Sequence, residues 1–290
     1  MDLLKKLLSI ATLFVLGNNL HAQNSLTNSQ LLGQLNTITT AVPFLIIAPD
    51  ARAAGMGETG VASSPDVYSM HWNVAKLAFA EKKYGVGLSY TPWLRALVPD
   101  INLGYLSMYM KPDSIRAFTA SVRYFSMGTI TISAMSGVIG QVRPYEYAID
   151  FGYSRRIAKY WSLGMAYRFI RSNLTNGISI AGQSSFVGQA FAVDLGVYYL
   201  DRERVKILGH PCIMMMGAAL TNVGSKIKYI SSAEPEFIPI NLRIGQGFRV
   251  NFDSKNSLSL QYELNKLLVP SPPIYALDSN GRPMTNSSGQ

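Results

Sequence analysis

The most constraining feature of this chain is a two-residue alternation of large apolar side chains with small or charged ones, repeated in segments of about ten residues. In one segment, Ile149 and Phe151 fall on the opposite side of an extended chain from Asp150. A soluble β-sandwich also alternates, but these segments carry aromatic residues near their ends and place charge on the side of the small residues. That combination is typical of strands with lipid on one face and a polar lumen on the other. The sequence therefore predicts an all-β protein, a transmembrane antiparallel β-barrel; the clearest segments are residues 145–154, 161–169 and 191–199.

The N-terminus has the features of a secretory signal peptide. Lys5 and Lys6 form a short basic region, and residues 7–17 form an apolar run that is too short to cross a membrane as a helix. Ala22 offers a small residue for cleavage. An N-terminal membrane anchor is the alternative, and the length of the run disfavours it. We expect cleavage after Ala22 and export, and the low share of charged residues, 15% of the chain, suits an exported barrel better than a soluble domain.

Short polar connections and long loops alternate between the candidate strands. Bacterial barrels place the short turns in the periplasm and the long loops outside the cell, which fixes the expected orientation. We expect residues 126–144 to form a separate hairpin, with Gly137 and Gly140 at its turn. The nine candidate strands are residues 84–91, 101–110, 116–125, 145–154, 160–171, 188–200, 211–221, 239–250 and 257–265.

Nine crossings is an odd number, whereas bacterial barrels normally close on an even number. Residues 266–290 resemble an external loop, so we expect the chain to be C-terminally truncated; a miscounted strand is the alternative. The expected organisation is a signal peptide (1–22), an N-terminal periplasmic segment with a lumen plug (23–82), and a partial barrel with long external loops (83–290).

Several charged residues fall on the lumen side of the candidate strands. They could line a conducting path. We expect instead that they pair with one another and with polar groups of residues 41–80, because buried charges need partners. These residues are Arg123, Asp150, Arg168, Asp194, Arg243, Arg249 and Glu263.

Three glycines match a dinucleotide-binding fingerprint, but the match lacks its structural context. Gly55, Gly57 and Gly60 have the required spacing, yet Pro49 interrupts the strand that should precede them. The chain that follows predicts an antiparallel sheet rather than the parallel sheet of a nucleotide fold. We expect these glycines to let the backbone pack tightly against the barrel wall.

The remaining reactive residues do not form a catalytic or metal-binding pattern. Asp66, Ser69 and His71 are close in sequence, but proximity along the chain is poor evidence for a triad. His71 and His210 lie far apart and lack further ligands at a helpful spacing, so we expect no metal site and no cofactor. Cys212, the single cysteine, is expected to be an inert packed thiol. The net charge of +9 is spread over turns and loops without a nucleic-acid motif, so anionic lipid or lipopolysaccharide is the expected counterpart.

The stretch before the first candidate strand carries a specific resemblance. Residues 43–45, the run Asp50-Ala51-Arg52-Ala53-Ala54-Gly55-Met56-Gly57 and residues 71–79 closely resemble the start of the PorV family. These are outer-membrane barrels of the Bacteroidetes type IX secretion system. The central run is shared more loosely by the wider FadL-like barrels. Later stretches that also resemble the PorV family are residues 144–150, 167–174 and 264–270.

The resemblance implies a FadL-type barrel of about fourteen strands, an even count. It also implies a protein without catalytic residues or cofactors that acts as a shuttle. Members of the family associate with the translocon SprA (Sov) and bind secreted cargo by its C-terminal signal domain. They then deliver the cargo to the attachment complex that contains PorU, which joins cargo to lipopolysaccharide. A FadL-like transporter of hydrophobic small molecules is the main alternative, and an enzyme acting on lipopolysaccharide is a third that lacks a catalytic set.

Cargo contacts are expected in the external loops, because rigid scaffolds concentrate binding residues in their loops. The loops are residues 92–100, 126–144, 172–187 and 222–238. The candidate contact residues are Trp93, Leu94, Leu97, Phe186, Phe237 and Ile238, each of which could instead pack within its own loop. The residues of the plug motif are Asp50, Arg52, Gly55, Gly57, Gly60, His71, Trp72 and Asn73.

Overall fold

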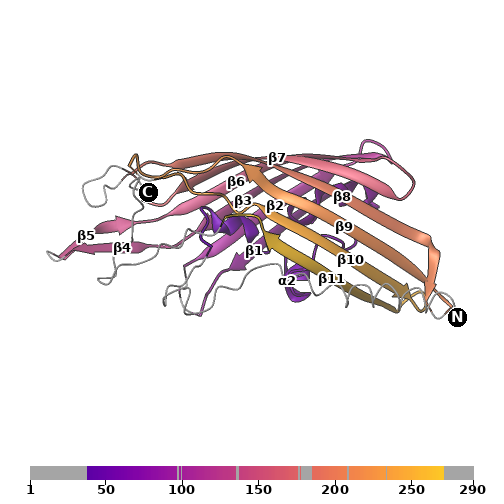
Figure 1. Cartoon of the computed structure of the whole chain (residues 1–290). Coiled ribbons are helices and arrows are strands. Elements are labelled where there is room, and N and C mark those ends of the chain that lie inside the picture. Colours follow the sequence, from indigo (N-terminus) through magenta and orange to yellow (C-terminus); the bar gives the residue numbers. More distant parts are fainter. Residues whose placement is uncertain are drawn as a thin grey trace, which may run out of the picture. The chain divides into compact units, whose positions relative to one another are not determined.

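A nine-stranded antiparallel sheet dominates the structure and curls around an N-terminal segment (Figure 1). The computed structural model describes residues 38–270 except 97, 99, 135–136, 176, 178–184, 208 and 233, and residues 40–269 form one unit. The strands lie side by side in chain order. They are β1 (Tyr84–Pro92), β2 (Asn102–Met110), β3 (Arg116–Ser126), β6 (Tyr145–Arg156), β7 (Trp161–Asn173), β8 (Gly188–Ile207), β9 (His210–Gly224), β10 (Asn241–Asn251) and β11 (Ser257–Leu267).

The sheet confirms the nine candidate strands and their order. The main difference is β8, which continues to Ile207 and shortens the turn that follows it. The separate hairpin is confirmed as β4 (Ile130–Ala134) and β5 (Gly137–Val142), which form their own two-stranded sheet. Gly137 is the first residue of β5, next to the turn, and has a φ of 115°. The prediction that Gly140 also lies at the turn is wrong, because Gly140 lies inside β5 and pairs with Ile132.

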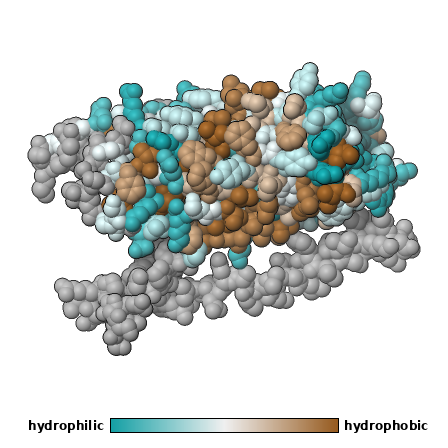
Figure 2. Space-filling model, turned by 90° about the horizontal axis from the view of Figure 1, so that it is seen from above, coloured by the Kyte–Doolittle hydropathy of each residue, from teal (hydrophilic) through white to brown (hydrophobic). Residues whose placement is uncertain are grey.

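The outer face of the sheet is apolar and exposed. Phe151, Met165, Leu195 and Leu260 all point away from the N-terminal segment and are about half exposed or more. In the central strands their neighbours on the other face, such as Asp150, Ala166 and Asp194, are buried, so the predicted alternation is confirmed there. In β11 the residues beside Leu260 are exposed or half-buried. Figure 2 shows hydrophobic residues gathered across the middle of the visible face, with hydrophilic residues toward both ends. A band of this kind, flanked by polar ends, suits contact with the hydrocarbon of a membrane.

The connections define two ends of the sheet. At the short-turn end, residues 111–115, 157–160, 208–209 and 252–256 join neighbouring strands. At the long-loop end, the connections are residues 93–101, 127–144, 174–187 and 225–240.

Residues 40–82, here called the inner segment, contact the concave face of the sheet and contain only short helices. The side chain of Asp50 accepts a hydrogen bond from Ala53 N at the start of one helix, and Asn73 caps another through Ala75 N. Among the described residues, no helix has both the length and the apolar composition needed to span a membrane. The helices are η2 (Pro43–Ile46), α2 (Ala51–Gly55), α3 (Ser69–Trp72) and η3 (Val74–Phe79).

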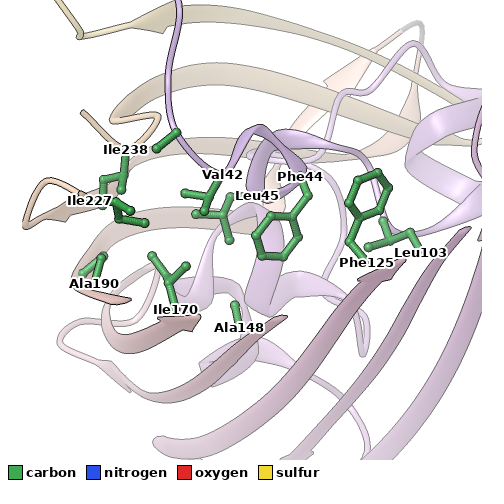
Figure 3. Close-up of a cluster of buried hydrophobic side chains, with 12 residues drawn as sticks. Val42, Phe44, Leu45, Leu103, Phe125, Ala148, Ile170, Ala190, Ile227 and Ile238 are labelled. Carbon is green, nitrogen blue, oxygen red and sulfur yellow. The ribbon is translucent and has the colours of Figure 1, made fainter. Parts of the chain in front are cut away.

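The largest apolar cluster lies at the long-loop end (Figure 3). Val42, Phe44 and Leu45 of the inner segment project into it from η2 and the residue before it. Ile227 and Ile238 reach the cluster from the long loop between β9 and β10. The sheet supplies Leu103, Phe125, Ala148, Ile170, Ala190 and Ala192. The inner segment therefore packs against the long loop between β9 and β10 and supports it from the interior of the sheet.

Glycines of the sheet allow the inner segment to approach closely. A Cβ atom at Gly164 would lie 2.6 Å from Ala75 N, and one at Gly196 or Gly217 would overlap Asn73 Oδ1 or Val61 O. The expectation that glycines of the inner segment serve this purpose is wrong for Gly55 and Gly57, where an added Cβ would meet no atom within 4 Å. A Cβ at Gly60 would overlap the ring of Trp72, which belongs to the inner segment itself.

We predict that Gly164→Ala destabilises the protein by about 1–3 kcal/mol, because the methyl group must displace the backbone of η3. Gly104→Ala is a matched control, since its Cβ would find its nearest neighbour, Tyr124 O, at 4.0 Å. Thermal unfolding in detergent micelles measures both. Equal midpoints for the two variants would contradict the close approach of the inner segment.

Candidate functional site

A buried ion-pair group lies at the centre of the concave face. Arg168 Nε is 2.5 Å from Asp150 Oδ1, and Arg168 Nη2 is 2.9 Å from Asp194 Oδ2. Arg168 also donates to the side-chain oxygen of Asn222. The strand register explains the group, because Asp150 is the direct partner of Arg168 across β6 and β7, and Asp194 pairs with Ala166 across β7 and β8. All of these charged side chains are almost fully buried, so their mutual pairing is required.

A second buried arginine joins the sheet to the inner segment. Arg123 Nη1 donates to Leu45 O at 2.7 Å, and Arg123 Nη2 lies 2.7 Å from His71 Nδ1. The guanidinium also lies over the ring of Tyr105, 5.1 Å from its centroid. Because an arginine only donates, Nδ1 of His71 must accept, which assigns the imidazole proton to Nε2. Burial and the neighbouring arginines lower the pKa of His71 well below its ordinary value, so this histidine is neutral.

A third group fixes the inner segment to the last two strands. Arg243 Nη1 of β10 is 3.0 Å from Glu263 Oε1 of β11. The other carboxylate oxygen of Glu263 accepts hydrogen bonds from the backbone of Gly60 and Val61 at 2.8 and 2.9 Å. Arg243 also lies over the Trp72 ring, 4.8 Å from its centroid.

The three groups confirm the expected pairing of inward charges for six of the seven predicted residues. The exception is Arg249, which is exposed and whose hydrogen bonds go to Ser257, a neighbour in the adjacent strand. Arg249 lies close to the short-turn end of β10 and lines a cavity together with Ser64 and Asp66 of the inner segment.

The plug motif forms the internal contacts of the inner segment. Asp50 accepts from Trp72 Nε1 at 2.8 Å while it caps α2. The amide of Asn73 donates to Val61 O and to Val197 O of β8. Arg52 stands apart, because it is exposed and forms a salt bridge with Asp66 at 2.6 Å. The motif therefore positions the segment, and its polar groups are used in contacts within the protein.

Lys76 is a buried residue that sequence reasoning missed. Its ammonium group donates to Gly60 O and Ser63 Oγ, both at 2.8 Å, and it has no exposed surface. Burial lowers the pKa of Lys76 to about 8. The sequence around Lys76 does not show that the ammonium group is buried, because the oxygens that accept from it belong to Gly60 and Ser63, in another part of the inner segment.

The described interior offers little for metal or cofactor binding. Among residues 38–270 outside the gaps given above, no group of three or more His, Cys, Asp or Glu side chains is placed to hold a metal ion. Cys212 is free and fully buried, as expected. A cavity of about 430 Å³ opens near the short-turn end, and charged residues such as Asp66, Glu81 and Arg202 line it together with apolar ones.

The candidate cargo residues at the long-loop end differ in exposure. Leu94 and Phe186 are exposed, at 52% and 42%. Trp93 is half-buried against the apolar cluster of Figure 3, and Phe237 is half-buried beneath Lys226, whose Nζ lies 4.0 Å from the ring centroid. Ile238 is 1% exposed and belongs to the cluster, so the alternative of packing within the protein applies to this residue. Leu97 lies outside the described residues.

Comparison with protein families gives one informative match. The sequence model of the family described as "Type IX secretion system protein PorV" matches residues 30–274. This range includes the inner segment and all nine strands of the sheet. A comparison with curated proteins finds no match.

We predict that Arg168→Gln destabilises the protein by about 3–5 kcal/mol, because it leaves Asp150 and Asp194 buried without a cation. Arg52→Gln is the control, since it removes an exposed salt bridge and should cost no more than about 1 kcal/mol. Thermal unfolding of the purified variants in micelles gives the comparison. A small effect at both positions would show that the buried group is dispensable.

We also predict a pH dependence that arises from Lys76. An unfolded lysine has a pKa of about 10.4, so between about pH 8 and 10.4 the folded protein binds fewer protons than the unfolded one. The free energy of unfolding should therefore rise with pH across this window. The stability gained when the buried Lys76 is neutral is lost as the pH falls through about 8.

Lys76→Met removes that titration, so its stability should rise less steeply between pH 7 and 10 than that of the wild type. Lys255→Met, at an exposed turn, should keep the wild-type slope. Chemical unfolding in micelles at several pH values measures the slopes. An unchanged slope in Lys76→Met would contradict the burial of a titrating ammonium group.

Proposed function

Because the chain belongs to the PorV family of type IX secretion system proteins, we propose that it is an outer-membrane shuttle for secreted cargo. It binds the C-terminal signal domain of the cargo at the SprA translocon and delivers the cargo to the attachment complex that contains PorU. The long-loop end faces the cell exterior, and the short-turn end faces the periplasm. Cleavage after Ala22 belongs to the same proposal, as does the lumen-plug role of the inner segment.

One observation carries the proposal. The inner segment packs tightly against the concave face of the sheet, and it also supports a loop at the long-loop end. Between the inner segment and strands β6 to β9, the glycine contacts leave no room for an added methyl group at Gly164 or Gly217. Polar groups there are used in pairs such as Arg168 with Asp150. An interior of this kind suits a scaffold better than a conduit, and it leaves the loops as the place for recognition.

The long-loop end has the features of a protein-binding surface. Leu94 is presented to the outside by a turn in which its backbone is left-handed, with a φ of 51°, and hydrogen bonds from Trp93 N and Val98 N hold that turn. Phe186 N bonds to Tyr229 O, which ties two long loops together. Exposed apolar side chains on a fixed backbone contribute binding energy at a small entropic cost. Arg95 follows Leu94 in the chain, and Lys228 precedes Tyr229, whose backbone oxygen accepts from Phe186 N. The cargo surface that fits this end is therefore apolar with an acidic rim.

The transporter of hydrophobic molecules is less well supported. Such a protein needs an apolar pocket between the inner segment and the wall. The cavity near the short-turn end includes Asp66, Glu81 and Arg202 in its lining, and burying a lipid tail against such charges is unfavourable. We propose no catalytic step for this chain.

We predict that Leu94→Ser combined with Phe186→Ser lowers the amount of cargo attached at the cell surface by about tenfold or more, because apolar anchors dominate the energy of protein interfaces. The measurement compares surface-attached cargo with cargo that still carries its C-terminal domain, in cells that make equal amounts of each variant. Ile157→Ser is the control, since this residue is 58% exposed at the opposite end. Normal attachment in the double variant would contradict the proposed surface.

A further inference from the structure

Two arginines stand directly opposite each other on the outer face of the sheet. Arg116 opens β3 and pairs with Arg155 near the end of β6. The alternation places Arg116 on the same face as the exposed Phe118, and Arg155 on the same face as the exposed Phe151. Both arginines are exposed, on the side away from the inner segment. Side chains that are directly opposite in an antiparallel pair have Cβ atoms about 4.5–5.5 Å apart.

This arrangement leaves one positive charge without compensation. Like charges directly opposite each other destabilise a sheet. Asp113 offsets one of them, since its Oδ2 accepts from Arg116 Nε at 2.6 Å. Arg155 has no ion pair or side-chain hydrogen bond with any residue in the described part of the chain. An anion placed between the two guanidinium groups would relieve the repulsion and use their free N–H donors.

The neighbouring side chains place the pair at the depth of lipid headgroups. One register step toward the middle of the sheet, the rings of Phe118 and Tyr153 are 5.2 Å apart. Toward the short-turn end, Trp161 and Tyr199 form a second outer-face pair with centroids 5.0 Å apart. Aromatic residues of this kind mark the boundary between hydrocarbon and water in membrane barrels. The arginines lie between the two aromatic pairs, one of which continues into the exposed apolar band.

We propose that Arg116 and Arg155 form a binding site for the phosphate group of a membrane phospholipid, at the short-turn end of the barrel. The two guanidinium groups bind the phosphate oxygens, for which their planar donor geometry is suited. The acyl chains of the same lipid lie along the apolar band over Phe118 and Phe151. A free phosphate ion would gain the charge contacts but none of the apolar ones, so the site favours a lipid. The inference depends on placement in a membrane and not on cargo binding.

The test uses the full-length protein in detergent micelles and measures thermal stability during titration with phosphatidylglycerol. Phosphatidylglycerol should stabilise the wild type, and the apparent affinity should fall about tenfold or more in Arg116→Gln with Arg155→Gln. Lys206→Gln with Lys255→Gln is the control, because it removes the same charge from exposed positions near the same end. This control should keep the wild-type affinity.

Two results would overturn the proposal. Equal weakening in the arginine and lysine double variants would show that only the net charge matters. Stabilisation of the wild type by inorganic phosphate at the same concentrations would show a general anion site instead of a lipid site. The measurement uses purified protein without any secretion partner, so a negative result would not bear on the proposed shuttle function. Evidence against the shuttle function would likewise not decide whether the two arginines bind lipid.

Discussion

The structure depends on polar partners for three buried arginines on the concave face of the sheet. Arg123, Arg168 and Arg243 have almost no exposed surface, and water cannot solvate them there. Arg168 finds its carboxylates within the wall, whereas Arg123 uses a backbone carbonyl and His71 of the inner segment. Glu263 serves both Arg243 and the backbone of the inner segment. The inner segment is therefore part of the electrostatic structure of the sheet, because it supplies the polar partners of Arg123 and donates two backbone hydrogen bonds to Glu263.

This constraint links the interior to the loops. The same inner segment that accepts from Arg123 at Leu45 also places Val42 and Phe44 in the apolar cluster at the long-loop end. Ile227 and Ile238 of a long loop pack on that cluster, and Ala41 N bonds to Phe237 O. A loop fixed in this way presents the same surface each time a partner arrives. Rigid support of this kind suits the binding of cargo that we propose.

Much of the wall could be predicted from the sequence, because a period of two fixes which side chains share a face. Asp150 and Arg168 could be placed on the inner face in this way. Their pairing could not, since it depends on the register between β6 and β7. Burial of Lys76 could not be predicted for a related reason, because its partners Gly60 and Ser63 lie 13 and more residues earlier in the chain. The glycines that allow the close approach lie in the sheet and not in the inner segment. The alternation predicts which residues of a strand are small, but it does not predict which residues pack against them.

The most direct test of the account is site-specific photo-crosslinking in living cells with a photoreactive amino acid at Leu94 or Phe186. If the long-loop end binds cargo, both positions should form cross-links to secreted proteins that still carry their C-terminal domain. The same probe at Ile157, exposed at the opposite end, should give none. Cross-links to cargo from Ile157 alone, or the absence of cargo adducts at Leu94 and Phe186, would contradict the claim that the long-loop end binds cargo.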